Sequence, residues 1–132
     1  MELPDSLKIL YIIYILGGSV DLNMVYETAL KASKRKVCCK GYRFHRENGN
    51  VYSKDVIYDI EALESFKMIE IIDSNGNKTL KLTQKGYDIV KNIENLLDRR
   101  DIEAIISVIK GDKRDGSNHA HALKKILKSI FK

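Results

Sequence analysis

The stretch of sequence that decides the fold reads Met68-Ile-Glu-Ile-Ile-Asp-Ser-Asn-Gly-Asn-Lys-Thr-Leu-Lys-Leu82. Both of its ends are rich in β-branched and apolar residues, which predicts two strands. Asn75-Gly76 between them favours a two-residue hairpin turn, because both positions of such a turn need positive φ. The turn fixes the register, and the predicted pairs are Ile69 with Leu82, Ile71 with Leu80, Glu70 with Lys81 and Asp73 with Lys78. Apolar pairs then share one side and opposite charges meet elsewhere, which predicts an antiparallel ribbon.

Helical patterns precede and follow this ribbon. The first predicted helix begins at Asp5 or Ser6, either of which would cap it, and runs to about Leu16. The second runs from Leu22 to about Ser33 and is capped by Asp21. The third runs from Lys54 to about Phe66 and is capped by Ser53, and a fourth is capped by Thr83. Ser19-Val20 is a short extended piece. Residues 34–52 have no helical period and contain Asn48-Gly49, so they are expected to form an extended segment with its own hairpin turn.

The order of elements predicts a mostly α fold with a small β-hairpin, an α+β class. Its helix, strand, helix, helix and hairpin follow the order of a winged helix-turn-helix domain. We expect this domain to span residues 1–98 with a basic insert at 34–52, and residues 99–132 to form a helical C-terminal extension. The extension has two apolar stripes, from Ile102 to Ile109 and from Leu123 to Ile130, which must be buried somewhere.

Three parts of the sequence resemble known winged-helix proteins. The segment from Asp59 to Glu70 looks like the end of a winged-helix third helix running into the wing. Leu82-Thr-Gln-Lys-Gly-Tyr87 is similar to the "LT.KG" motif that follows the wing in PadR- and MarR-type regulators. Tyr42, Phe44 and Asn50-Val-Tyr-Ser53 resemble YwgA-like winged-helix proteins, whose insert ends in a "GPYS"-like motif, although Asn50 and Val51 replace its glycine and proline. The resemblance covers about residues 7–92 and implies a winged-helix DNA-binding fold.

Positive charge is concentrated in one part of the chain. The formal net charge is +5, and the segment from Lys31 to Asp55 holds eight bases against two acids. Such a block is typical of a surface that meets a polyanion. We therefore expect a nucleic-acid-binding protein, specifically a DNA-binding transcriptional regulator with double-stranded DNA as its partner. The expected nucleic-acid-binding residues are Lys34, Arg35, Lys36, Lys40, Arg43, Arg46, Tyr52, Ser53, Lys54, Asn75, Asn77 and Lys78.

The third helix limits how DNA could be bound. Its predicted exposed side includes Asp55, Asp59, Glu61 and Glu64, and carboxylates repel a polyanion. DNA contact is therefore expected at the N-terminal tip of this helix. The alternative function is a protein-binding adaptor or inhibitor that docks through the acidic side.

Catalysis is not expected. The sequence has no glycine-rich phosphate loop, no Ser/His/Asp arrangement and no cluster with metal-ligand spacing, so we predict no catalytic residues, metal or cofactor. Cys38 and Cys39 are adjacent and are expected to be reduced thiols, since neighbouring cysteines seldom form a bridge. With no predicted membrane span, this indicates a cytoplasmic protein.

The stripes of the extension suggest self-association. A homodimer formed through the C-terminal helices would space two DNA-binding units symmetrically. The alternative is that these helices fold back onto the first helix within one chain. The lysines opposite the last stripe also allow contact with a membrane surface as a minor alternative.

Overall fold

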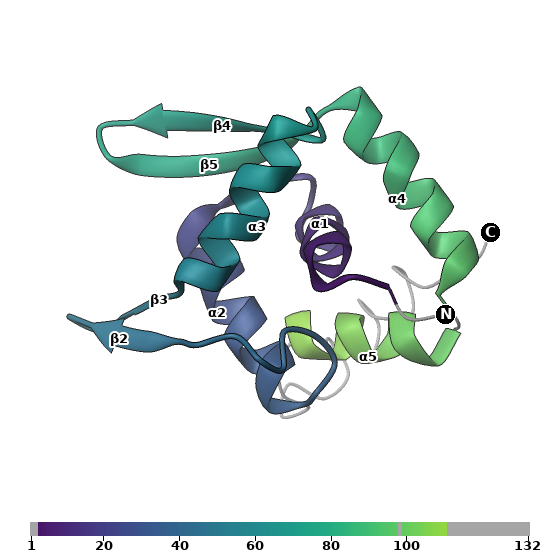
Figure 1. The fold of residues 1–132 in the computed structure, drawn as a ribbon, viewed down its shortest axis with the longest axis horizontal. Coiled ribbons are helices and arrows are strands. Elements are labelled where there is room, and N and C mark those ends of the chain that lie inside the picture. The colour runs from purple at the N-terminus through teal and green to yellow at the C-terminus, as the bar shows by residue number, and fades with distance from the viewer. Residues whose placement is uncertain (1–2, 98, 111–132) are drawn as a thin grey trace.

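The computed structural model describes residues 3–97 and 99–110 and confirms the mostly helical α+β class (Figure 1). In chain order the elements are α1 (Asp5–Ile15), β1 (Ser19–Asp21), α2 (Leu22–Lys34), β2 (His45–Glu47), β3 (Asn50–Tyr52), α3 (Lys54–Ser65), β4 (Ile69–Ser74), β5 (Asn77–Leu82), α4 (Gln84–Leu96) and α5 (Arg99–Ile109). The second stripe of the predicted extension, from Leu123 to Ile130, lies outside the described residues. None of the helices within residues 3–97 and 99–110 is long and apolar enough to cross a membrane.

The β4–β5 ribbon has the predicted register. The structure pairs Ile69 with Leu82, Glu70 with Lys81, Ile71 with Leu80 and Asp73 with Lys78. Asn75 and Gly76 at the turn have φ of 55° and 86°, the left-handed conformation that this dipeptide tolerates. The sequence did not reveal that the short β1 pairs with β5, which completes a three-stranded sheet in the order β1-β5-β4. The ribbon is therefore held to the rest of the chain by the strand between α1 and α2.

Helix α1 is the centre of the core. It lies among the other helices, and Figure 1 shows it nearly end-on between α3, α4 and α5. Five consecutive residues, Ile9 to Ile13, are almost fully buried, Tyr11 among them. A helix buried all round needs apolar residues on every side, which is why the run has no polar position.

Three of the four predicted helix caps are confirmed. Asp21, Ser53 and Thr83 accept hydrogen bonds from backbone N–H groups in the first turns of α2, α3 and α4. The prediction for α1 is wrong, because Pro4 occupies the N-cap position and makes no side-chain cap. Asp5 is already inside the helix, and its carboxylate instead accepts a hydrogen bond from the backbone N–H of Cys39 at 3.1 Å.

Helix α5 belongs to the same core. Ile102, Ile105, Ile106 and Val108 are buried, and α5 contacts α1 and α2. Most of the stripe from Ile102 to Ile109 is thus covered within one chain by α1 and α2, as the fold-back alternative predicted. The homodimer prediction also depended on the stripe from Leu123 to Ile130, which lies outside the described residues, so it stays a prediction.

Gly86 fixes the close approach of α4 to the end of α3. A Cβ at this position would overlap the carbonyl oxygen of Met68 and lie 3.1 Å from Cδ2 of Leu82. Gly86→Ala is therefore expected to destabilise the protein by about 1–3 kcal/mol through overpacking against a backbone atom. Helix propensity alone would favour alanine by about 1 kcal/mol, so the two effects have opposite signs.

Chemical denaturation of the Gly86→Ala variant measures the net change in the free energy of unfolding. Gly41→Ala is the control, because a Cβ at Gly41 would have no heavy atom within 4 Å. A Gly86→Ala protein as stable as the wild type would show that the α4 contact is looser than described.

Candidate nucleic-acid interface

The basic insert contains a second ribbon, made by β2 and β3. Its turn residues Asn48 and Gly49 have φ of 52° and 83°, as the Asn-Gly dipeptide predicted. The ribbon packs on α2 through Val51, which is 3% exposed, and through the ring of Tyr52, whose centroid lies 5.7 Å from that of Tyr26. Two ribbons, β2–β3 and β4–β5, therefore extend from the same side of the helical body (Figure 1).

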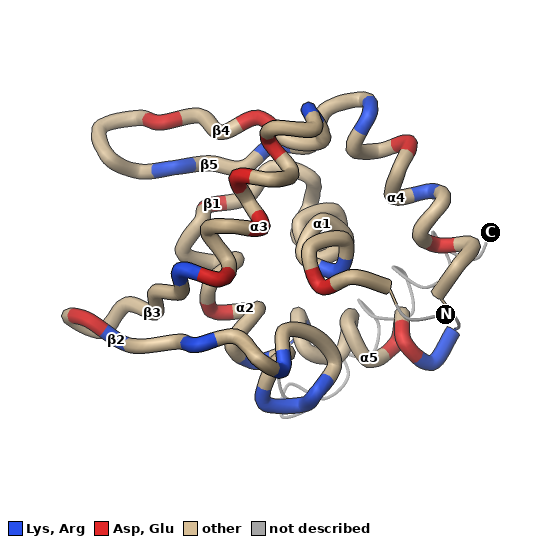
Figure 2. The backbone as a smooth tube through the Cα atoms, in the orientation of Figure 1, with Lys and Arg blue, Asp and Glu red and all other residues tan. Residues whose placement is uncertain are grey.

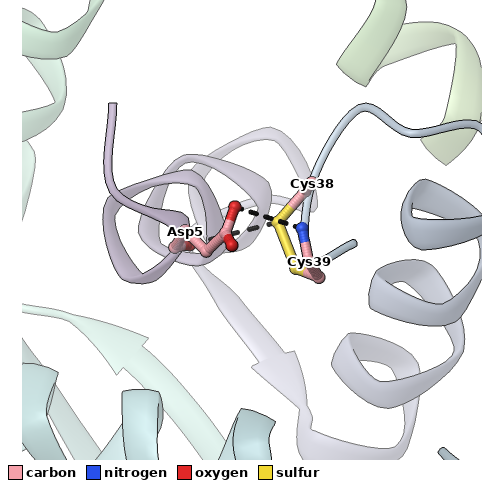
Figure 3. A group of neighbouring side chains, drawn as sticks. All are labelled: Asp5, Cys38 and Cys39. Carbon is pink, nitrogen blue, oxygen red and sulfur yellow. Dashed lines mark hydrogen bonds between the residues drawn. A yellow bond between two sulfur atoms is a disulfide. The ribbon is translucent and has the colours of Figure 1, made fainter. Parts of the chain in front are cut away.

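The loop between α2 and β2 is held to α1 by a cysteine pair. Figure 3 shows Cys38 and Cys39 joined by a disulfide beside Asp5, so the prediction of reduced thiols is corrected. Both cysteines are buried, and the N–H of Cys39 donates to the Asp5 carboxylate. The two sulfurs and a carboxylate oxygen of Asp5 lie within 4.8 Å of one another, a spacing suited to a metal ion, but each sulfur is bonded to the other. We assign this cluster a structural role in fixing the loop.

The same loop is also held to α3. The hydroxyl of Tyr42 donates to the carboxylate of Asp59, and the backbone N–H of Arg43 donates to Asp55 at 2.7 Å. Burial, followed by the hydrogen bond to Asp59, raises the pKa of Tyr42. Burial also raises the pKa of Asp59, against the opposing effect of the bond from Tyr42. Two of the four acids expected to face a ligand from α3 are thus engaged within the protein.

Four of the seven tyrosines have raised pKa values, which predicts how the protein responds to alkali. Burial, with a smaller contribution from Tyr52, raises the pKa of Tyr26 to about 12. Burial is also the largest cause for Tyr11, Tyr14 and Tyr42. Above pH 10 the folded state then holds more protons than the unfolded state, so the stability that these phenols contribute is lost as pH rises through their folded pKa values.

A spectrophotometric titration of tyrosinate absorbance checks this prediction. At least four phenols should ionise together with the loss of helical circular dichroism, in one cooperative step. A gradual titration of all seven around pH 10, with the helical signal intact, would contradict it.

The residues expected to bind nucleic acid fall into separate groups. One hollow of about 270 Å³ lies at the N-terminal end of α3 and is lined by Arg43, His45, Lys54 and Asp55. A second hollow of about 340 Å³ brings Tyr52 together with Asn77 and Lys78 of the other ribbon. The rings of His45 and Tyr52, paired across β2 and β3, lie 5.0 Å apart and join the two hollows. We call the two hollows together with this ring pair the ribbon face: Arg43, His45, Tyr52, Lys54, Asn77 and Lys78. Asp55 also lines the first hollow and Asp21 the second.

The other expected residues lie elsewhere. Arg35 donates to the hydroxyl of Ser107 on α5, and Lys36 and Lys40 line a cavity that contains no residue of the ribbon face. Lys34 and Asn75 are exposed, at the end of α2 and at the β4–β5 turn, and line neither hollow. Ser53 is fully buried and caps α3, so its side chain is not available to a ligand and the prediction for it is wrong.

The two arginines of the β2–β3 region lie beside carboxylates. The Arg43 guanidinium is 3.9 Å from Asp55 and its side chain is 88% exposed, while Arg46 is 3.7 Å from Glu27 on α2. Exposed pairs of this kind contribute about 0–1 kcal/mol, so a phosphate can replace a carboxylate at little cost. His45, Asp55 and Glu27 were not among the residues expected at the site. His45 and Asp55 are neighbours in sequence of expected residues, whereas Glu27 lies on α2, and nothing local in the sequence connects it with the β2–β3 turn.

The remaining exposed surface of α3 differs from the ribbon face. Tyr58 and Phe66 are 64% and 62% exposed, and the exposed acids Glu61 and Glu64 lie between them in sequence. Figure 2 shows the positive charge of the insert along the loop before β2 and at the start of α3, whereas the rest of α3 is acidic.

Comparison of the chain with models of protein families, with curated proteins and with solved structures found no match.

Proposed function

We propose that this protein binds nucleic acid through the ribbon face and acts in the cytoplasm as a winged-helix regulator on double-stranded DNA. The observation that supports this proposal most strongly is the convergence of both ribbons and the N-terminal end of α3. Arg43 and Lys54 line one hollow, Lys78 lines the other, and the His45–Tyr52 pair connects them.

The chemistry of this surface suits a sugar-phosphate backbone. Arg43, Lys54 and Lys78 can each neutralise a phosphate, and Asn77 can donate to a phosphate or sugar oxygen. The N-terminal end of a helix also favours an anion, because its backbone N–H groups and dipole point outward there. Phosphates therefore approach the tip of α3, at Lys54.

Base recognition is expected to be weak. Past its first turn, α3 presents Glu61 and Glu64, which would repel the phosphates that flank a major groove. Only the tip of the helix can approach the duplex, so most contacts reach the backbone rather than the base edges. The proposed mode thus has modest sequence preference and strong dependence on salt.

Fluorescence anisotropy of a labelled random duplex, titrated with the full chain at several salt concentrations, tests the proposal. Neutralisation of about three phosphates predicts a slope of about −3 in a plot of log affinity against log salt concentration. Absence of binding at low salt, or an affinity that does not change with salt, would overturn the proposal.

A second function is supported by a separate observation, the exposed aromatic rings on α3. Tyr58 and Phe66, with Glu61 and Glu64, offer apolar and acidic groups that suit a partner protein with basic and apolar residues. Under this alternative, Tyr58→Ala would abolish partner binding and would leave duplex binding unchanged. If the same substitution removed duplex binding, the assignment of nucleic acid to the ribbon face would be wrong.

A further inference from the structure

A cavity lies on a part of the protein that the proposed function does not use. It has a volume of about 560 Å³ and is bounded by the start of α1, the loop after α2, and the junction of α4 with α5. This volume falls within the range of about 300–1,000 Å³ that is usual for small-molecule sites. None of its lining residues belongs to the ribbon face.

Positive charge from three distant parts of the chain converges on this cavity. Lys8 comes from α1, Lys36 and Lys40 from the loop, and Arg100 from α5, and Asp101 is the one acid among the lining residues that the structure describes. Like charges brought together raise the electrostatic free energy, and an anion between them would lower it. The arrangement thus favours a negatively charged occupant.

The position of these cations is fixed by local structure. The Lys8 ammonium donates to the carbonyl of Val37 at 3.1 Å, which ties the loop to α1. Lys36 follows the end of α2 and has a φ of 59°, the left-handed conformation that commonly ends a helix. The disulfide between Cys38 and Cys39 lies between Lys36 and Lys40 in the loop.

The cavity also has an apolar side. Leu96 is 58% exposed, and Val37 and Leu97 are partly buried against the core. A bare inorganic anion would leave this apolar wall in contact with water. A ligand with an apolar group covers it and gains hydrophobic free energy in proportion to the area removed from water.

We propose that this cavity binds a small amphipathic anion, an organic carboxylate or phosphate monoester with an apolar chain or ring. The acidic group lies among Lys36, Lys40 and Arg100, and the apolar group lies against Leu96 and Leu97. The proposal does not depend on nucleic-acid binding, because the two sites share no lining residue.

Isothermal titration calorimetry of the full chain with octanoate tests the proposal. Acetate, which has the carboxylate but no long apolar chain, and 1-octanol, which has the chain but no negative charge, are the comparison ligands. We expect saturable binding of one octanoate per chain, no detectable binding of acetate and much weaker binding of octanol. Octyl phosphate in place of octanoate shows which acidic group the cations prefer. Absence of saturable octanoate binding, or equal binding of octanol, would overturn the proposal.

Variants locate the site. Lys36→Ala combined with Lys40→Ala should weaken octanoate binding about tenfold or more, because charge-assisted contacts are lost. The matched control is Lys81→Ala combined with Lys85→Ala, which removes two exposed lysines that do not line the cavity. Both lysines of the loop are exposed, so the variant is expected to fold. If both double variants bind octanoate like the wild type, the ligand occupies another site and the proposal fails.

Discussion

Ile106→Ala is expected to destabilise the protein by about 2–5 kcal/mol, a large part of the stability of a domain this size. Ile106 is fully buried in α5, which packs on α1 and α2. Truncation removes apolar contacts and leaves a cavity that neighbouring side chains fill only in part. Urea denaturation followed by circular dichroism measures the loss.

The same helix supplies the control. Glu103→Ala removes only an exposed ion pair with Arg99 and should cost no more than about 0.5 kcal/mol. Should Ile106→Ala not fold, Ile106→Val offers a milder change, with an expected loss of about 0.5–1.5 kcal/mol. If Ile106→Ala costs as little as Glu103→Ala, α5 is not part of the core.

The triple variant Arg43→Ala, Lys54→Ala, Lys78→Ala is expected to lose duplex affinity by roughly 100-fold at low salt. Each charge-assisted phosphate contact contributes on the order of 1 kcal/mol, and three such contacts correspond to about this factor. The slope of log affinity against log salt concentration should also fall in size by about 3. Fluorescence anisotropy measures both quantities.

A charge-matched variant separates the ribbon face from general electrostatic attraction. Lys67→Ala, Lys85→Ala and Lys91→Ala together remove the same net charge at exposed positions after α3 and on α4, and none of these lysines lines either hollow. This variant should keep most of its duplex affinity. Equal losses in the two triple variants would mean that net charge alone, rather than the ribbon face, attracts the duplex.

The parts of the fold that the sequence predicted are those set by local chemistry. The register from Ile69 to Leu82 follows from one Asn-Gly turn and from the alternation of side chains across the strands. Asp21, Ser53 and Thr83 act as caps because a short polar side chain can reach a backbone N–H two or three residues later. Such features need no knowledge of the rest of the chain.

The path of the loop after α2 could not be predicted in the same way. It depends on contacts between distant residues, such as the Cys39 N–H with Asp5 and the Tyr42 hydroxyl with Asp59. These contacts turn Lys36 and Lys40 toward α1 and α5, while Arg43 stays beside α3. One basic block in the sequence therefore becomes two surfaces in the structure, with different ligands proposed for each.

The burial of α5 shows the same limit. The stripe from Ile102 to Ile109 was correctly identified as buried, but periodicity cannot say whether a stripe packs within one chain or against a second copy. The answer depends on the surface that α1 and α2 present together, against which α5 packs.

Chemical-shift mapping of the isotope-labelled chain during titration with a short duplex tests the central claim most directly. The account predicts that amide signals of residues 43–54 and 76–78 shift in proportion to added duplex, while those of residues 58–66 on the exposed side of α3 do not move. Shifts confined to residues 58–66, or to the loop cations at 34–40, would contradict the assignment of nucleic acid to the ribbon face.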